Sequence, residues 1–396
     1  MSEMSYLEKL LDGVEVEWRN LGDTSLFEIA NNGRKPVKAS LRIAGETPYY
    51  GANNIQDYVD GYTHDGEYVL IAEDGSASLE NYSIQYATGK FWANNHVHVV
   101  RGKERIHSRF LYHYLCIVNF LPFLTGGGRA KLTKGQLIEI PVPIPCPENP
   151  EKSLAIQSEI VRILDKFTAL TAELTAELNM RKKQYNYYRD QLLSFDEEQE
   201  KPIYLEKLLD GVEVEWLPLS DLARIRNGKD HKSLSEGEFP VYGSGGIMRY
   251  VDTYAYNKPS VLIPRKGSLG NLFFIDVPFW TVDTIFYTEI DEAQIRPKYL
   301  YYFLSTVGLG EMNQAGGVPS QTQSVLNKLK IPIPCPDNPE KSLAIQSEIV
   351  RILDKFDTLT NSITEGLPRE IELRQKQYEY YRDLLFSFPK PETASN

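Results

Sequence analysis

Apolar residues recur at alternating steps of four and three between residues 150 and 195. This heptad spacing lines one side of a helix and is typical of a coiled coil. A helix of about forty residues would measure roughly 60 Å at 1.5 Å per residue, which is longer than one small core needs. The pattern therefore predicts a long helix whose seam packs on a second helix. The seam residues are Ile156, Ile160, Ile163, Phe167, Leu170 and Leu174.

The same pattern returns 189 residues later, because residues 147–167 reappear at 336–356 with Glu148 replaced by Asp337. Here Gly366 and Pro368 fall inside the helical pattern, and a proline inside a helix predicts a kink. The sequence thus predicts two long helices whose seams pack on each other. The second seam comprises Ile345, Ile349, Ile352, Phe356, Leu359 and Ile363.

The start and the middle of the first long helix carry their own signals. Asn149 is a suitable N-cap and Pro150 suits the first helical position, so the helix is predicted to begin there. Residues 171–178 read Thr-Ala-Glu-Leu twice. One such unit changes a helix by about 6 Å and about 40°, so this tandem predicts an adjustable spacer.

A second repeat shows that the chain is duplicated. Residues 6–18 recur unchanged at 204–216, which defines units of about 6–195 and 204–388 with dissimilar middle segments. The middle segments contain short apolar runs between Gly, Asn, Asp and Pro, and this composition predicts β-rich domains. Strand-like runs lie at 68–71, 95–100, 260–263 and 284–287, predicted short helices at 108–120 and 297–306, and proline-punctuated extended runs at 140–145 and 331–334.

These patterns predict an α+β protein: two pseudo-twofold-related, globular, β-rich domains separated by a long two-helix coiled coil. The predicted boundaries are an N-terminal arm with the first domain at 1–147, a long helix at 148–195, a linker with the second domain at 196–336, a long helix at 337–390 and a disordered tail at 391–396.

Composition limits the function. The three cysteines lack the spacing of metal ligands, and we expect them to be buried, small apolar residues. They are Cys116, Cys146 and Cys335. Without a leader-like segment or an apolar run of about 18 residues, the chain is expected in the cytoplasm. The net charge of −11 argues against a protein that grips nucleic acid unaided.

Motifs for catalysis are missing from the sequence. It contains no phosphate-binding loop, no methyltransferase tetrapeptide and no glycine-rich cofactor loop. His96 and His98 alternate along a predicted strand, but two histidines without a third ligand more often line one face of a sheet. We therefore expect no catalytic residue, metal or cofactor in this chain.

Basic and amide residues in glycine-flanked loops of the variable segments are candidates for DNA contacts. Arg suits guanine edges, Gln suits adenine edges and Lys suits phosphates, although any single one is more often a solvated surface group. The loops after Gly126 and Gly316 occupy the same place in both units with different sequences. The candidates are Arg34, Lys35, Lys38, Arg42, Arg129, Lys131, Lys134, Arg224, Arg226, Lys229, Lys232, Arg265, Lys266, Ser320, Gln321 and Gln323.

Aromatic residues at the ends of the long helices lie on more than one helix face. They could pack against the neighbouring domain, or anchor another protein, because aromatics near Arg are frequent interface anchors. They are Tyr185, Tyr187, Tyr188 and Arg189 in the first copy and Tyr378, Tyr380, Tyr381 and Arg382 in the second.

The whole chain resembles the DNA-specificity subunit (HsdS) of type I restriction-modification enzymes. The resemblance lies in the constant regions: Ala-Ile-Gln-Ser-Glu-Ile-Val-Arg-Ile-Leu-Asp-Lys-Phe in both copies, and Gln-Tyr-x-Tyr-Tyr-Arg-Asp at the helix ends. The tandem Thr-Ala-Glu-Leu and the residues before Trp18 are similar to the EcoR124-like branch.

The resemblance implies a non-catalytic, sequence-specific DNA-binding subunit. Each target-recognition domain would read one half of a bipartite asymmetric site in double-stranded DNA. The two long helices would form an antiparallel coiled coil that sets the spacer between the half-sites. Conserved regions would dock two adenine-N6 methyltransferase (M) subunits that use S-adenosylmethionine, and restriction (R) subunits would join the complex and use ATP with Mg. The alternative is a non-catalytic coiled-coil scaffold with β-rich protein- or glycan-binding domains. A third possibility is that the chain is itself an enzyme.

Overall fold

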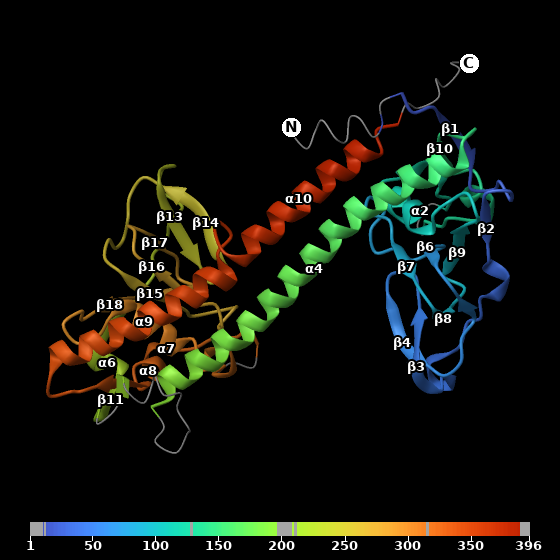
Figure 1. Ribbon diagram of the computed structural model, residues 1–396. Helices are drawn as coiled ribbons and strands as arrows, with labels where there is room; N and C mark the ends of the chain where they lie inside the picture. The colour runs from blue at the N-terminus through green and yellow to red at the C-terminus, as the bar shows by residue number, and fades with distance from the viewer. Residues whose placement is uncertain are drawn as a thin grey trace. The chain divides into compact units, whose positions relative to one another are not determined.

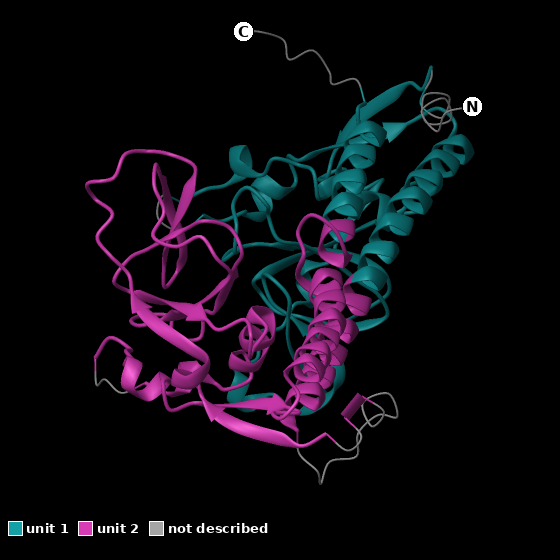
Figure 2. Ribbon diagram, turned by 90° about the vertical axis from the view of Figure 1, so that its left-hand side faces the viewer, with its two compact units in different colours: residues 1–174, 371–396 teal, residues 175–370 magenta. Residues whose placement is uncertain are grey.

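The computed structural model describes residues 11, 13–126, 130–195, 208–209, 212–313 and 317–388. Its contacts divide the chain into two compact units. Unit 1 consists of residues 1–174 and 371–396, and unit 2 consists of residues 175–370 (Figure 2). Each unit therefore combines one variable segment with parts of both predicted long helices.

In unit 1, the described residues of the variable segment form two four-stranded sheets. The first has the order β2-β9-β6-β7, with β2 at Phe27–Ile29, β9 at Val97–Gly102, β6 at Tyr68–Ala72 and β7 at Ile84–Ala87. The second has the order β4-β3-β8-β5, with β4 at Ile55–Val59, β3 at Ala44–Tyr50, β8 at Lys90–Ala93 and β5 at His64–Asp65. Short helices are η1 at Asn31–Gly33, η2 at Ala39–Leu41, α2 at Ser108–Leu115, η3 at Leu121–Phe123 and α3 at Lys134–Leu137.

Strand β6 is buried on both faces, which explains its unbroken apolar sequence. Because side chains alternate along a strand, its residues divide between two cores. Val69 and Ile71 join the main core beneath α2, whereas Tyr68 and Leu70 join a smaller cluster around Phe91. The predicted strand at 68–71 is confirmed and forms the centre of this domain.

Unit 2 repeats this arrangement with three rather than four strands in its second sheet, in agreement with the duplication seen in the sequence. Its central strand again alternates, since Val261 and Ile263 face the main core and Leu262 faces a smaller cluster. One sheet has the order β12-β18-β15-β16, at Ala223–Asn227, Ile285–Ile290, Ser260–Pro264 and Phe273–Ile275. The other has the order β14-β13-β17, at Gly246–Val251, Phe239–Gly243 and Trp280–Thr281. The short helices are α6 at Leu219–Leu222, α7 at Pro297–Leu304, η4 at Leu309–Glu311 and α8 at Gln323–Leu326.

The proline-punctuated runs are strands, in each case in a two-stranded antiparallel ribbon. In unit 1, β10 (Pro141–Pro145) pairs with β1 (Val16–Asn20), and in unit 2, β19 (Lys330–Pro334) pairs with β11 (Val214–Pro218). Proline is tolerated there because an edge strand leaves backbone donors unpaired on one side. Each ribbon places the end of a repeated segment, at Trp18 or Trp216, beside the strand that leads into a long helix.

Two predicted helix lengths are wrong. Helix α2 ends at Leu115, before the predicted end at Phe120, and α7 ends at Leu304, before Thr306. The residues after α2 form turns and then η3, which begins at Leu121 and contains Pro122. Proline supplies no backbone donor and cannot continue the α-helical hydrogen-bond ladder.

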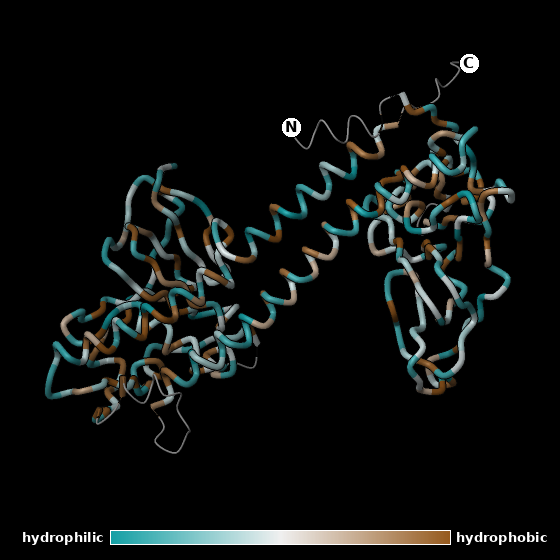
Figure 3. Tube along the Cα trace, in the orientation of Figure 1, coloured by the Kyte–Doolittle hydropathy of each residue, from teal (hydrophilic) through white to brown (hydrophobic). Residues whose placement is uncertain are grey.

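Helix α4 runs from Pro150 to Ser194, 45 residues, as the heptad pattern predicts (Figure 1). Asn149 caps it, because its Oδ1 accepts a hydrogen bond from Lys152 N at 3.0 Å. Along α4, hydrophobic and hydrophilic positions alternate without a long apolar stretch (Figure 3). The helices of the described part of the chain include no apolar span of the length that a membrane crossing requires.

The second long helix is interrupted rather than kinked at the proline. Five residues, 362–366, separate helix α9 (Pro339–Asn361) from α10 (Leu367–Leu385). Gly366 has φ +83, and a Cβ there would lie 2.4 Å from Thr358 O. Pro368 occupies the first turn of α10, where proline fits a helix. The break therefore precedes the proline, and the glycine permits it.

The seam prediction is correct in part. In unit 1, Phe167 stacks on Tyr381 of α10 with ring centroids 5.3 Å apart, and in unit 2, Tyr188 stacks on Phe356 of α9 at 5.5 Å. However, Leu164 and Leu353, outside the predicted seam, are fully buried in the main cores of their units. Two seam positions are exposed: Leu170 at 37% and Ile363, in the break, at 79%.

Constant residues of the long helices hold the variable domains through backbone atoms. Gln157 Oε1 accepts a hydrogen bond from His107 N at 2.8 Å, and its Nε2 donates to Arg105 O at 3.1 Å. Gln346 makes the same pair of contacts with Arg296 N and Gln294 O in unit 2. Contacts to backbone tolerate changes of side chain, so two different domains can dock on identical helices.

A carboxylate at equivalent positions of α4 and α9 adds side-chain contacts. Asp165 Oδ1 lies 2.9 Å from Arg109 Nε and 2.8 Å from His113 Nε2. In unit 2, Asp354 accepts from Lys298 Nζ at 2.8 Å and from the Tyr302 hydroxyl at 2.6 Å. The partners differ because α2 and α7 belong to the variable segments.

Candidate nucleic-acid interface

Three loops of unit 1 meet at one edge of the variable domain. The β3–β4 turn contacts the segment after β6, because Asn53 Nδ2 donates to Gly75 O at 2.9 Å and Ala77 N donates to Asn53 Oδ1 at 2.8 Å. The loop after the glycines joins them, since the backbone of Lys131 forms an isolated antiparallel β-bridge with that of Asp74. We call residues 51–54, 73–77 and 130–134 the first loop cluster.

Glu73 is the centre of the first loop cluster. Its carboxylate lies 2.6 Å from Arg34 Nη1 and 3.0 Å from Lys131 Nζ, and its side chain is 15% exposed. Burial by itself raises the pKa of the Glu73 carboxyl, but the hydrogen bonds from Arg34 and Lys131 outweigh burial and hold this pKa below its usual value. Two basic residues predicted as separate candidates are therefore joined by one half-buried carboxylate.

Unit 2 builds the equivalent cluster from different residues. Asn271 Nδ2 donates to Ser244 O at 3.1 Å, which links the β13–β14 turn to the segment after β15. The backbone of Lys266 forms an isolated antiparallel β-bridge with that of Ser320, and Gln321 N donates to Arg265 O at 3.0 Å. We call residues 243–246, 265–271 and 317–323 the second loop cluster. It contains the predicted residues Arg265, Lys266, Ser320, Gln321 and Gln323.

The amide nitrogens of the second loop cluster donate hydrogen bonds to protein atoms, whereas Gln321 Oε1 is buried without a partner. Gln321 is 2% exposed and its Nε2 donates to Pro264 O at 2.6 Å. Gln323 Nε2 donates to Asn227 Oδ1 at 3.3 Å. In this structure, Gln321 holds its loop against β15 rather than presenting its amide to a ligand.

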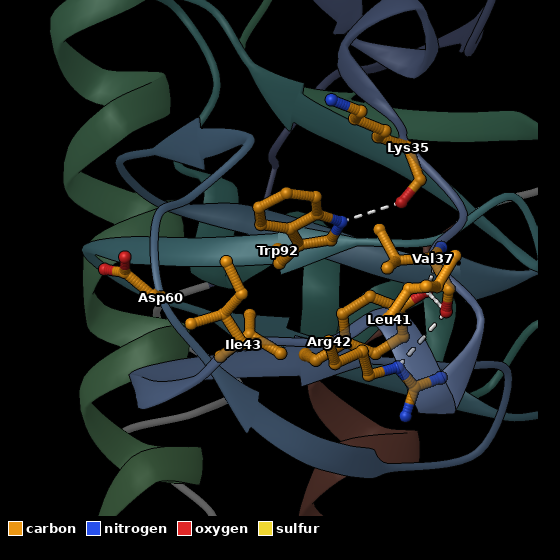
Figure 4. A pocket seen from close by; sticks show the side chains of 9 residues that line it. Lys35, Val37, Leu41, Arg42, Ile43, Asp60 and Trp92 are labelled. Atoms are coloured by element: carbon orange, nitrogen blue, oxygen red, sulfur yellow. Dashed lines mark hydrogen bonds between the residues drawn. The ribbon is translucent and has the colours of Figure 1, made fainter.

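A cavity of about 280 Å³ lies beside Trp92 in unit 1 (Figure 4). The indole Nε1 donates to Lys35 O at 2.7 Å, and the Lys35 ammonium lies 5.9 Å from the Trp92 ring centroid. Arg42 stacks on Tyr49 at 4.1 Å and contacts Asp57 Oδ2 at 3.2 Å. Lys35 and Arg42 are thus brought together at an aromatic cavity, which the sequence did not reveal.

The other candidates are dispersed. Lys38, Arg224, Lys229 and Lys232 are exposed on the surface, as is Lys134 at the end of the first loop cluster. Arg226 is paired with Glu289 at 2.9 Å across β12 and β18. Arg129 lies outside the described residues. The structure therefore gathers some of the predicted residues in the two loop clusters and beside Trp92, and leaves the others apart on the surface.

Comparison with known proteins decides the family. The sequence matches the family described as "Type I restriction modification DNA specificity domain" over residues 14–181 and 211–373. The chain belongs to the type I specificity-subunit family. It is 40% identical to the type I restriction enzyme EcoR124I/EcoR124II specificity subunit of Escherichia coli, over 100% of both chains. It is 34% identical to the EcoprrI specificity subunit of Escherichia coli, covering 92% of this chain and 93% of that protein.

A solved structure agrees with the fold of this specificity subunit. The crystal structure of the type I restriction-modification S subunit from M. genitalium aligns with a TM-score of 0.63, at 18% sequence identity. The alignment covers 96% of this chain and 98% of that chain. The predicted family and the predicted fold, two β-rich domains with long helices, are both confirmed.

The helix ends of the specificity subunit divide into packed and exposed tyrosines. Tyr185 and Tyr188 contact Phe356 in unit 2, and Tyr378 and Tyr381 pack in the main core of unit 1. By contrast, Tyr187 and Tyr380 are 52% and 55% exposed. Arg189 and Arg382 pair with the neighbouring carboxylates Asp190 and Asp383.

Exposed residues of the β3–β4 and β13–β14 hairpins were missed by the sequence analysis. Tyr58 and Tyr250 are 54% and 50% exposed, and Met248 is 59% exposed. The sequence did indicate that these hairpins are equivalent, because Tyr58-Val-Asp60 and Tyr250-Val-Asp252 share the same tripeptide at corresponding positions of the two variable segments. These hairpins begin at the turns of the loop clusters, so they add an aromatic surface next to the basic loops.

The histidines serve structural contacts. His96 Nδ1 lies 2.5 Å from Asp74 Oδ1. His98 is fully buried, with Nδ1 2.9 Å from Asn31 Nδ2 and Nε2 2.7 Å from Leu132 O, and burial lowers the pKa of its imidazole. Within the described part of the chain, no group of three or more His, Cys, Asp or Glu side chains could hold a metal ion. All three cysteines are free thiols, half-buried rather than buried as predicted.

Proposed function

We propose that this chain is the sequence-specific DNA-binding subunit of a type I restriction-modification complex, with each variable domain reading one half of a bipartite, asymmetric site. The observation that carries this proposal is the loop cluster that both units build on the same topology with different chemistry. Glu73, Asp74 and Lys131 in the first are matched by Arg265, Lys266 and Ser320 in the second. Two equivalent surfaces of unlike chemistry suit two different half-sites.

The contrast between constant and variable parts supports the same proposal. The long helices repeat almost residue for residue and dock each domain through Gln157 or Gln346. A changed domain can therefore use an unchanged frame. The boundary between the two units falls at Leu174, inside the tandem Thr-Ala-Glu-Leu, and Ala172, Glu173, Thr175 and Ala176 are exposed there. An exposed, repeated helical segment suits a spacer between half-sites.

Partner subunits explain how an acidic chain can act on DNA. With a net charge of −11, this chain is expected to bind DNA weakly alone, because phosphate contacts depend on Lys and Arg. We infer that two adenine-N6 methyltransferase (M) subunits supply such contacts and carry S-adenosylmethionine, while R subunits use ATP with Mg. The complex would act in the cytoplasm. Exposed Tyr187 and Tyr380, at equivalent places, are proposed docking residues with Arg189 and Arg382.

The proposal is tested by methylation mapping. The chain is co-expressed with its methyltransferase subunit, the complex is purified, and methylated adenines are sequenced. A single bipartite motif is expected, and exchange of residues 19–146 for the corresponding segment of another specificity subunit should change one half of it. Failure to retain the methyltransferase subunit, or a change in both halves, would contradict the proposal.

A further inference from the structure

The segments that follow the central strands carry opposite charges in the two domains. Strand β6 is followed by Glu73 and Asp74, and β15 ends at Pro264 and is followed by Arg265 and Lys266. The backbone contacts establish that these positions are equivalent. Leu132 N donates to Glu73 O at 2.8 Å, and Gln321 N donates to Arg265 O at 3.0 Å. Two negative charges in one domain thus replace two positive charges in the other.

In the first domain, the carboxylate at this position orients cations from two other segments. Glu73 holds Arg34, which follows η1, and Lys131, which follows the glycines. His98 supports the same loop, because its Nε2 lies 2.7 Å from Leu132 O. The Lys131 side chain remains 46% exposed. Glu73 therefore fixes the direction of a lysine that still reaches the surface.

In the second domain, the corresponding side chain has few competing contacts. Arg265 is half-buried, with Nη1 3.5 Å from Asp283 O and its guanidinium 5.9 Å from the Phe286 ring centroid. Within the described residues, no carboxylate is ion-paired with it. Its backbone is held on both sides, since Arg265 N donates to Thr284 O at 2.9 Å and Arg265 O accepts from Gln321. A fixed backbone, and a guanidinium that is ion-paired with no carboxylate of the described residues, suit recognition of a base edge.

We propose that positions 73 and 265 are equivalent specificity-determining positions of the two domains. Arg265 reads a guanine edge directly, because its donors match O6 and N7 of guanine in the major groove. Glu73 is a positioning residue that acts through Lys131. This inference rests on the proposed function, and it names the residues by which the two half-sites come to differ.

The experiment uses the complete complex of the chain with its methyltransferase subunit. Methylated adenines are mapped on a randomised DNA library for the wild type, Glu73→Gln and Arg265→Gln. The half-site that changes when residues 19–146 are exchanged identifies the first domain. Controls from the same domains, outside the loop clusters, are Glu28→Gln, which breaks the pair with Arg101, and Lys258→Gln. Both controls should retain the wild-type motif.

Arg265→Gln should reduce discrimination for guanine at one position of the second half-site by about 10- to 100-fold, because a bidentate contact contributes about 1–3 kcal/mol. Glu73→Gln should relax the first half-site and leave the second unchanged. A purely structural role of Glu73 would lower methylation without changing the motif. That result, or an unchanged second half-site in Arg265→Gln, would overturn the inference.

Two further outcomes are distinguishable. If Glu73→Gln does not assemble with the methyltransferase subunit, Arg265→Gln decides, because its partly exposed side chain lies outside the main core. If the wild-type complex methylates no bipartite motif, the proposed function fails. If the wild type methylates such a motif and Arg265→Gln methylates the same one, only the assignment of these positions fails.

Discussion

Leu164→Ala should destabilise unit 1 strongly, although the heptad pattern leaves Leu164 off the predicted seam. The side chain is 0% exposed and belongs to the main core of unit 1, which includes Phe110 and Leu111 of α2. Truncation of a buried leucine removes its transfer free energy and leaves a cavity. The expected loss is about 3 kcal/mol, within the usual range of roughly 2–5 kcal/mol.

A matched control separates this explanation from a general effect on the helix. Leu170→Ala makes the same chemical change on the same helix, but Leu170 lies on the predicted seam and is 37% exposed. Its expected cost is below about 1 kcal/mol, because little cavity can form at an exposed site. Leu353→Ala, at the equivalent buried position of α9, should match Leu164→Ala in unit 2.

Thermal unfolding of the purified chains, followed by circular dichroism, provides the measurement. For a unit of about 200 residues, 1 kcal/mol shifts the unfolding temperature by roughly 2–4 °C. Leu164→Ala should therefore lower the transition of unit 1 by roughly 6–12 °C, and Leu170→Ala by only a few degrees. Equal shifts for the two variants would refute the conclusion that α4 forms part of the domain core.

Two other predictions concern pH and length. Burial lowers the pKa of the His113 imidazole to about 4 from 6.5, despite its contact with Asp165. The unfolded chain therefore binds the extra proton first, and the stability of unit 1 should fall by roughly 3 kcal/mol as pH falls from about 6.5 to 4. In urea unfolding, the free energy of unfolding of His113→Gln should not show this fall with pH. The same pH dependence in the wild type and in His113→Gln would argue against a role of His113. Insertion of Thr-Ala-Glu-Leu after Leu178 adds about 6 Å of helix, so methylation mapping should show a gap longer by one to two base pairs. Altered half-sites would count against the spacer.

The local elements could be predicted because their signals are local. Asn149 and Pro150 mark the start of α4, and the buried strand β6 is an unbroken apolar run. The duplication was readable for the same reason, since identical segments must form the same helix start twice. The break before α10 was only half predicted: Pro368 suggested a kink, whereas α9 already ends at Asn361, where the chain becomes extended at Ser362, and the left-handed Gly366 directly precedes α10.

Only the tertiary structure decided which surface each side chain faces. A heptad pattern identifies apolar positions, but it cannot assign Leu164 to a domain core and Leu170 to solvent. Similarly, a glutamine in a glycine-flanked loop has the same sequence context whether it is exposed or, like Gln321, buried against a neighbouring strand. Such choices depend on contacts between residues far apart in the chain.

By itself, the sequence determined the duplication, the long helices and the loops in which the two domains differ, because repeats and periodicity are properties of neighbouring residues. The tertiary structure decided that Glu73 gathers Arg34 and Lys131, and that Arg265 occupies the same place in the other domain. Both facts depend on strands and loops that meet only when the chain folds, because an ion pair requires two charged groups to be close in space, whatever their separation in the sequence.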